Sequence, residues 1–168
     1  MFIDSHCHLD FPDLAEDIDS VLHRMTAAEV THALCVSVTL EDLPRLRSVI
    51  AGHQNLFSSV GVHPDYEDVR EPTVDELVSL ADAPGVVAIG ETGLDYFRIQ
   101  SDAEWQRERF RTHIRAARRC GKPLIVHTRS ASEDTLRILK EEGADAVGGV
   151  MHCFTESWEV AQGAIDLG

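Results

Sequence analysis

The segment Phe2-Ile3-Asp4-Ser5-His6-Cys7-His8 begins the chain with a short, largely apolar run that ends in two histidines. Similar short runs of apolar or β-branched residues recur along the sequence, each bounded by Gly, Pro, Asp or Asn. They span residues 32–38, 56–62, 86–91, 123–127 and 147–152. We therefore predict six β-strands, of which residues 2–8 form the first.

Amphipathic stretches separate the predicted strands. Apolar residues at helical spacing predict helix over 14–25, and Thr73-x-x-Glu76 and Ser101-x-x-Glu104 have the pattern of helix-opening capping boxes. Strands that alternate with helices predict a parallel sheet with the helices outside it.

The spacing of the units predicts the fold more narrowly. It is close to that of a (β/α)8 barrel, which takes about 250 residues, so 168 residues hold six units. We expect residues 1–168 to form one α/β domain of TIM-barrel type that contains only the first six βα units. The chain stops where a seventh strand would begin.

Metal-binding residue types follow the predicted strands. Functional groups of parallel α/β proteins gather at the carboxyl ends of the strands. Five of the six predicted strands deliver a histidine or glutamate there: His6 and His8, His63, Glu91, His127, and His152. Alternate residues of a strand point to one face, so His6 and His8 should point into the barrel and Cys7 away from it. The convergence predicts a metal site.

Other residues near these ends allow two interpretations. Arg129, two residues after His127, would bind a phosphate at the mouth of the barrel or cap the following helix. Asp95 and Tyr96 would line the rim or simply form a turn.

Charge and composition exclude several classes of protein. The formal net charge is −14, from 15 basic and 29 acidic residues, so the chain repels polyanions at long range. Residues 104–122 hold seven of the basic residues, and a solvated outer face is favoured there over a DNA-facing patch. No membrane-length apolar run or export signal is visible, and the four cysteines are widely spaced. We expect a soluble cytoplasmic protein; its oligomeric state is left open.

Five motifs occur in order along the chain: Phe2-Ile3-Asp4-Ser5-His6-Cys7-His8-Leu9-Asp10, Gly61-Val62-His63-Pro64, Ile89-Gly90-Glu91-Thr92-Gly93-Leu94-Asp95-Tyr96, Val126-His127-Thr128-Arg129 and Met151-His152-Cys153-Phe154. Together they closely resemble those of TatD-type metal-dependent deoxyribonucleases, a branch of the amidohydrolase superfamily. The resemblance implies a distorted TIM barrel and exonuclease or general DNase activity on phosphodiesters, with DNA as the substrate.

The resemblance also assigns roles to the strand-end residues. His6 and His8 would hold one metal ion, and Glu91 would bridge to a second ion that His127 and His152 complete. The catalytic residues would be Glu91, with His63 and Arg129 near the scissile phosphate. The cofactors would be two divalent ions per subunit; the family is usually described as magnesium-dependent, whereas imidazole ligands suit Zn or Mn better than Mg.

One departure from the family leaves alternatives open. The family's last barrel strand supplies an aspartate in a Thr-Asp-x-Pro-Tyr context, and no such segment occurs here. The chain would then be a fragment or split gene product, or an inactive remnant. Another alternative is an amidohydrolase acting on small esters or amides. Two-metal members of that superfamily often carry a carboxylated lysine where Glu91 stands, and the only lysines here are Lys122 and Lys140.

Overall fold

The computed structural model describes residues 1–99 and 102–168. Its six strands are all parallel and are paired in chain order: β1 Phe2–Cys7, β2 Val30–Cys35, β3 Leu56–Val60, β4 Val86–Asp95, β5 Leu124–Arg129 and β6 Gly149–Met151. The six predicted strands and their parallel order are therefore confirmed. β4 runs beyond its predicted end at Glu91, because it pairs with β5 as far as Asp95 and Arg129.

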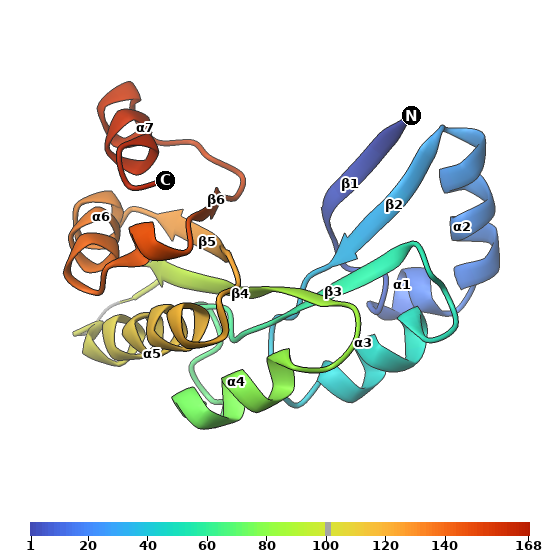
Figure 1. Cartoon of the computed structure of the whole chain (residues 1–168), viewed down its shortest axis with the longest axis horizontal. Coiled ribbons are helices and arrows are strands. Elements are labelled where there is room, and N and C mark those ends of the chain that lie inside the picture. Colours follow the sequence, from blue (N-terminus) through green and yellow to red (C-terminus); the bar gives the residue numbers. More distant parts are fainter. Residues whose placement is uncertain (100–101) are drawn as a thin grey trace.

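Helices cover one side of the curled sheet. They are α1 Pro12–Ala15, α2 Ile18–Ala27, α3 Leu43–Ile50, α4 Val74–Ala81, α5 Glu104–Cys120, α6 Ser132–Glu141 and α7 Trp158–Ile165, with a 3-10 turn at Ala144–Ala146. Figure 1 shows the sheet as an open trough with α2 to α6 on its outer face and the two chain ends on opposite sides of the opening. This is the curved α/β half-barrel that the repeating units predict.

The helix starts agree with the sequence where the structure describes them. The hydroxyl of Thr73 accepts a hydrogen bond from the backbone N–H of Glu76, which confirms this cap. Ser101, the other predicted cap, lies outside the described residues. The apolar residues over 14–25 pack on the core as expected. They belong to two helices, α1 and α2, because the predicted helix is interrupted near Asp17.

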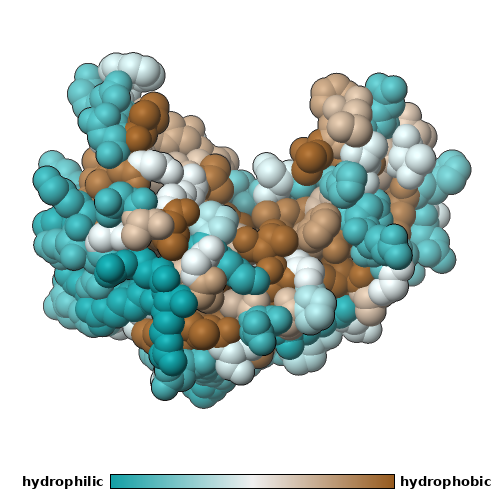
Figure 2. Space-filling model, in the orientation of Figure 1, coloured by the Kyte–Doolittle hydropathy of each residue, from teal (hydrophilic) through white to brown (hydrophobic). Residues whose placement is uncertain are grey.

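Three clusters of buried side chains form the core, and the smallest consists of Val36, Ala88 and Ile125. The largest one joins β3, β4 and β5 to α4, α5 and α6, with Phe110 and Ile114 at its centre. The second one joins β1 and β2 to α1, α2 and α3 through Leu9, Cys35 and Leu46. Figure 2 shows that the molecule is hollowed between its two arms, with apolar residues along the hollow. Within the described residues, no helix is both long and apolar enough to span a membrane.

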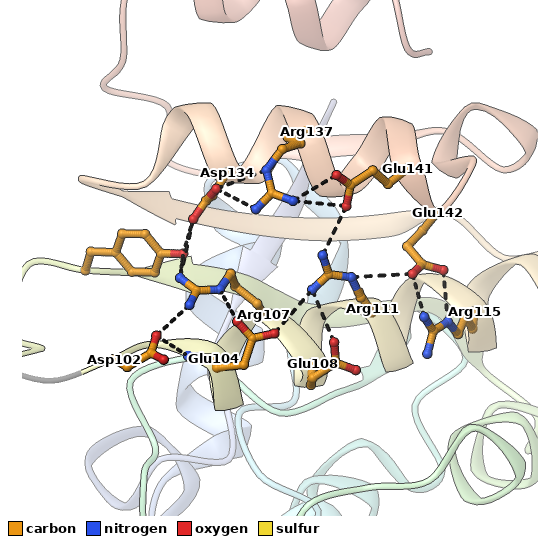
Figure 3. A network of polar contacts seen from close by, with 11 residues as sticks. Asp102, Glu104, Arg107, Glu108, Arg111, Arg115, Asp134, Arg137, Glu141 and Glu142 are labelled. Atoms are coloured by element: carbon orange, nitrogen blue, oxygen red, sulfur yellow. Dashed lines mark hydrogen bonds and ion pairs between the residues drawn. The ribbon is translucent and has the colours of Figure 1, made fainter.

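The basic residues of α5 and its C-terminal end are paired within the protein. Figure 3 shows Arg107, Arg111 and Arg115 in a network with carboxylates of α5 and α6, with Asp102, and with Glu142 just after α6. The other four bind carboxylates or backbone carbonyls: Arg109 to Glu71, Arg118 to the carbonyl of Glu142, Arg119 to Asp75, and Lys122 to the carbonyls of Ala81 and Val86. These charges hold α5 against its neighbours, and they do not form a DNA-facing patch.

Candidate metal centre

The carboxyl ends of the first and last strands meet at one site. The rings of His6, in β1, and His152, just after β6, stack with centroids 3.3 Å apart. The rings of His6 and His8 lie edge to face at 5.2 Å. Cys7 instead packs on the core cluster that joins β1 and β2 to α1, α2 and α3. Its Sγ lies 3.9 Å from that of Cys35. The alternation of β1 therefore separates imidazoles from thiol as the sequence predicts.

Glu91 lies at the centre of the histidines and is only 3% exposed. Its Oε2 is 3.2 Å from Nε2 of His6. Its Oε1 is 3.6 Å from Nε2 of His63 and 3.4 Å from Nδ1 of His127. The two oxygens of one carboxylate thus face two different sets of imidazole nitrogens.

Glycines let the backbone bring Glu91 to this place. Gly90 and Gly93, on either side of it, have φ values of +143° and +132°, which residues with a Cβ rarely adopt. A Cβ on Gly61 of the neighbouring chain segment would lie 2.6 Å from the backbone of Gly90, so only glycine fits between them. The backbone N–H of Glu91 donates a 3.0 Å hydrogen bond to the carbonyl of Ser37.

Hydrogen bonds fix which nitrogen of two histidines faces the site. Nδ1 of His8 lies 3.1 Å from the carbonyl of Val36, which can only accept, so Nδ1 carries the proton and Nε2 keeps a free lone pair. Nε2 of His127 lies 3.0 Å from Oδ2 of Asp95 and donates to it, so Nδ1 faces Glu91. A carboxylate or carbonyl on the outer nitrogen is the usual arrangement of metal-binding histidines.

His63 is oriented the other way round. Its Nδ1 accepts a 3.1 Å hydrogen bond from the backbone N–H of Asp65, so in the neutral ring the proton sits on Nε2. That proton points towards the cluster, where Nδ1 of His127 lies 3.3 Å away. In this orientation His63 offers a proton to the site, and its Nε2 has no lone pair for a metal.

The charges of the site are set by burial and by mutual contacts. Burial would raise the pKa of the Glu91 carboxyl, but its close contacts with the imidazoles of His127 and His6 hold this pKa well below its usual range. Burial lowers the pKa of His63 to about 4, so this ring is neutral at pH 7. His127 is also buried, yet its contacts with Glu91 and Asp95 raise its pKa. The site therefore contains an ionised carboxylate beside imidazoles, a combination that favours a bound cation.

The donor atoms fit divalent metal ions. Two sets of side chains bring potential ligand atoms within 4.8 Å of one another: His6, His8 and Glu91 form one set, and His63, Glu91 and His127 form the other. In the second set the orientation of His63 leaves Glu91 and His127 as the metal ligands. Nε2 of His6 is buried and has no hydrogen-bond partner within the described residues. Two ligands of a tetrahedral zinc ion, with bonds of about 2.0–2.1 Å, lie about 3.3 Å apart, close to the 3.2 Å from His6 to Glu91.

The structure brings the predicted site residues together with two differences in arrangement. The resemblance groups His152 with His127, but His152 lies against His6, and His63 is the histidine beside His127. Arg129 is exposed at the rim, where its guanidinium lies 3.7 Å from the centroid of the Phe97 ring. Arg129 therefore lies at the same edge of the sheet as the site, but its guanidinium is outside the cluster of histidines and Glu91.

Sequence reasoning missed two supporting residues and left a third open. Asp95, left open as rim or turn, holds His127. Gln106, buried in α5, accepts from the backbone N–H of Asp95 and donates to the carbonyls of Asp95 and Pro64. Nε2 of buried His113 accepts from the N–H of Val62, next to His63. Strand-end position could have indicated Asp95, whereas nothing in the pattern of α5 indicates Gln106 or His113.

Known proteins match nearly the whole chain. The family model described as "TatD related DNase" matches residues 3–168. A protein of Escherichia coli K12 named "Uncharacterized metal-dependent hydrolase YcfH" is 44% identical over 170 residues, which cover 99% of this chain and 63% of that protein. A protein of Enterobacter lignolyticus named "3'-5' ssDNA/RNA exonuclease TatD" is 33% identical over 162 residues, 96% of this chain and 62% of that protein.

Solved structures match the fold as closely. The crystal structure of YJJV, a TatD homologue from Escherichia coli K12, has a TM-score of 0.90 and 29% sequence identity, and the match covers 99% of this chain and 65% of that one. This likeness confirms the predicted barrel-type α/β fold. The chain spans less than two thirds of the length of each of these three proteins.

Proposed function

Because the chain belongs to the family of TatD-related DNases, we propose that its cluster of histidines and Glu91 binds two divalent metal ions and hydrolyses phosphodiester bonds of DNA, acting from the ends as an exonuclease. The name of the Enterobacter relative, which specifies exonuclease action on nucleic acid, supports this substrate class. The four widely spaced cysteines favour the cytoplasm as its compartment.

One observation carries the proposal: the two carboxylate oxygens of Glu91 face different sets of nitrogens. His6 and His8 would hold one ion with Oε2, and His127 would hold the other with Oε1. His152, whose ring lies beside that of His6, would be the remaining imidazole ligand. When bound, such a pair of ions polarises the phosphoryl group and lowers the pKa of a coordinated water.

The other residues would bind and orient the substrate. His63 holds a proton on Nε2 and would donate it in a hydrogen bond to a phosphoryl oxygen. Arg129 forms no ion pair with any described residue, so its guanidinium at the rim is free to bind the phosphate. Asp95 fixes the ring of His127 and thus keeps Nδ1 directed at the site.

The position of the lysines argues against the amidohydrolase alternative. The carboxylated lysine of that chemistry would have to reach the place of Glu91. Lys122 instead binds the carbonyls of Ala81 and Val86, and Lys140 is exposed on α6. These positions support Glu91, a carboxylate, as the strand-four ligand that the nuclease branch would use.

The proposal is tested by following the release of labelled nucleotides from DNA. Protein stripped with a chelator should be inactive, and added Mn, Zn or Mg should restore activity. Glu91→Gln should reduce the rate by at least about 100-fold, since it removes the charge shared by both ion sites. Glu133→Gln, at an exposed position of α6, is the matched control and should retain the full rate.

Two results would overturn the proposal. One is hydrolysis of DNA by Glu91→Gln at the rate of the control variant, with circular dichroism showing that both are folded. The other is hydrolysis of a panel of small esters and amides, but not of DNA, by the metal-loaded protein.

Native mass spectrometry should count two ions per chain in the unmodified protein and fewer in Glu91→Gln.

A further inference from the structure

Three exposed aromatic side chains border the candidate metal centre. Phe11, Tyr66 and Phe97 are 37%, 38% and 60% exposed, although large aromatic rings are usually covered. Each follows a different strand by a few residues, so all three belong to loops at the carboxyl ends of the sheet. We call these three side chains the aromatic rim.

Two side chains of the aromatic rim contact site histidines, and the backbone of the third contacts Asp95. The ring of Phe11 stacks on that of His8, with centroids 4.8 Å apart and planes inclined by 20°. The ring of Tyr66 lies edge to face with that of His63 at 6.1 Å. Phe97 follows Asp95 by two residues, and its N–H donates to the Asp95 carboxylate. A planar group that lies on the rim is therefore adjacent to the site.

Phe97 has a second planar group beside it. The guanidinium of Arg129 lies 3.7 Å from the centroid of its ring, in the geometry of a cation–π contact. A guanidinium held on an aromatic face can bind a phosphate through its edge and a nucleobase through its free face. Phe97 and Arg129 thus offer a combined surface for one nucleotide.

The charge of the protein makes such a surface necessary for a nucleic-acid substrate. With a net charge of −14, and with the basic residues of α5 paired to carboxylates or carbonyls, the chain has little positive charge for the phosphate backbone. Stacking of bases on aromatic side chains does not depend on charge, and it is tolerant of sequence. Affinity for the substrate would then come largely from the bases.

We propose that Phe11, Tyr66 and Phe97 form a stacking rim that binds unpaired bases next to the scissile phosphate. Such a rim would give a physical basis for action on single strands, which the name of the Enterobacter relative specifies for that protein. The proposal deepens the proposed function and rests on it for the reaction at the site. Paired bases in a duplex have their faces covered by neighbouring bases, so they cannot lie on the rim.

Binding is measured without hydrolysis to keep the two proposals apart. The probe is a fluorescein-labelled oligothymidylate, and its anisotropy is followed in chelator, which blocks hydrolysis. An abasic oligonucleotide of the same length has the same phosphates but no bases. The unmodified protein should bind the oligothymidylate at least about 10-fold more tightly than the abasic strand or a hairpin duplex.

Variants of Phe97 identify the residue responsible. Phe97→Ala should weaken binding of the oligothymidylate by about 5- to 100-fold without changing binding of the abasic strand. Phe97→Trp keeps a flat aromatic face and should restore the affinity. Phe2→Ala is the matched control, because Phe2 is 63% exposed but lies at the opposite end of β1.

The outcomes are distinct. Equal affinity for the oligothymidylate and the abasic strand, or an unchanged affinity in Phe97→Ala, would overturn the stacking rim and leave the proposed hydrolysis standing. Stacking-dependent binding by a protein that fails to cleave DNA with metal would support the rim and contradict the proposed function. A steep fall in affinity with salt, as for binding through many phosphates, would also count against the rim.

Discussion

The buried histidine of α5 makes the stability of the fold dependent on pH. His113 is completely buried; its Nδ1–H donates to the carbonyl of Arg109, and its Nε2 accepts from the N–H of Val62. Burial lowers the pKa of this ring to about 4, against 6.5 for an exposed histidine. The unfolded chain therefore takes up a proton at a higher pH than the folded chain. Stability is fully present above pH 6.5 and is lost as the pH falls towards 4.

The size of the effect follows from the two pKa values. At about pH 5 the unfolded ring is almost fully protonated and the folded ring only about one-tenth, which corresponds to a loss of about 2 kcal/mol relative to pH 8. His113→Gln keeps an oxygen that can accept from Val62 but does not titrate. At pH 8 the free energy of unfolding of the variant should be about 1–3 kcal/mol lower than that of the unmodified protein. Between pH 8 and about pH 5 this free energy should fall by about 2 kcal/mol less in the variant than in the unmodified protein.

Urea unfolding in chelator, followed by circular dichroism at several pH values, measures this difference. The buried His63 also contributes to the acid sensitivity of both proteins, and subtraction of the two curves removes its effect. His23→Gln, at an exposed position of α2, is the control and should follow the curve of the unmodified protein. Curves of His113→Gln and the unmodified protein that stay parallel from pH 8 to about pH 5 would refute the reasoning.

Three further substitutions have defined outcomes. Gly93→Ala places a Cβ against the backbone carbonyl of His127 and should lower the melting temperature far more than Gly52→Ala, where the φ is also positive but nothing lies within 4 Å of the new atom; equal shifts in differential scanning fluorimetry would contradict this. Asp95→Asn should weaken metal binding by about 10- to 100-fold in a competition titration with a zinc dye, and unchanged affinity would show that His127 needs no such support. Arg111→Met should destabilise the contact of α5 with α6 by about 1 kcal/mol in urea, and the loss should shrink at high salt; a loss that salt does not alter would exclude an ionic contribution.

The sequence predicts the strands and the gathering of site residues because both depend on local pattern. Each strand is a compact apolar run, and the carboxyl ends of parallel strands lie on one edge whatever the details of packing. His6 and Glu91, separated by most of the first half of the chain, could therefore be placed together. The end of β4 was not predictable, since Thr92 and Gly93 have the composition of a turn and become strand only through pairing with β5.

Contacts that depend on side-chain orientation could not be predicted. His63 lies beside His127, and His152 lies beside His6. These neighbours depend on contacts such as that of the Asp65 backbone N–H with His63 and on the curl of the sheet, neither of which has a sequence signal. The arginines of α5 give the pattern of a solvated face, but acidic residues of α6 and of other segments lie within reach and pair with them. The support of the site by Gln106 likewise requires the packing of α5 on β4 to be known.

The two larger core clusters lie in different arms of the molecule, and this gives the metal centre a mechanical role. His6 and His8 extend from the arm built on β1 and β2, whereas His127 and His152 extend from the arm built on β5 and β6. Ions held jointly by both arms would act as cross-links, so that neither arm could move away without breaking coordination bonds. Under a pulling force applied to the two chain ends, the loaded protein should yield in a single event at higher force, and the stripped protein should extend in two steps, one arm after the other.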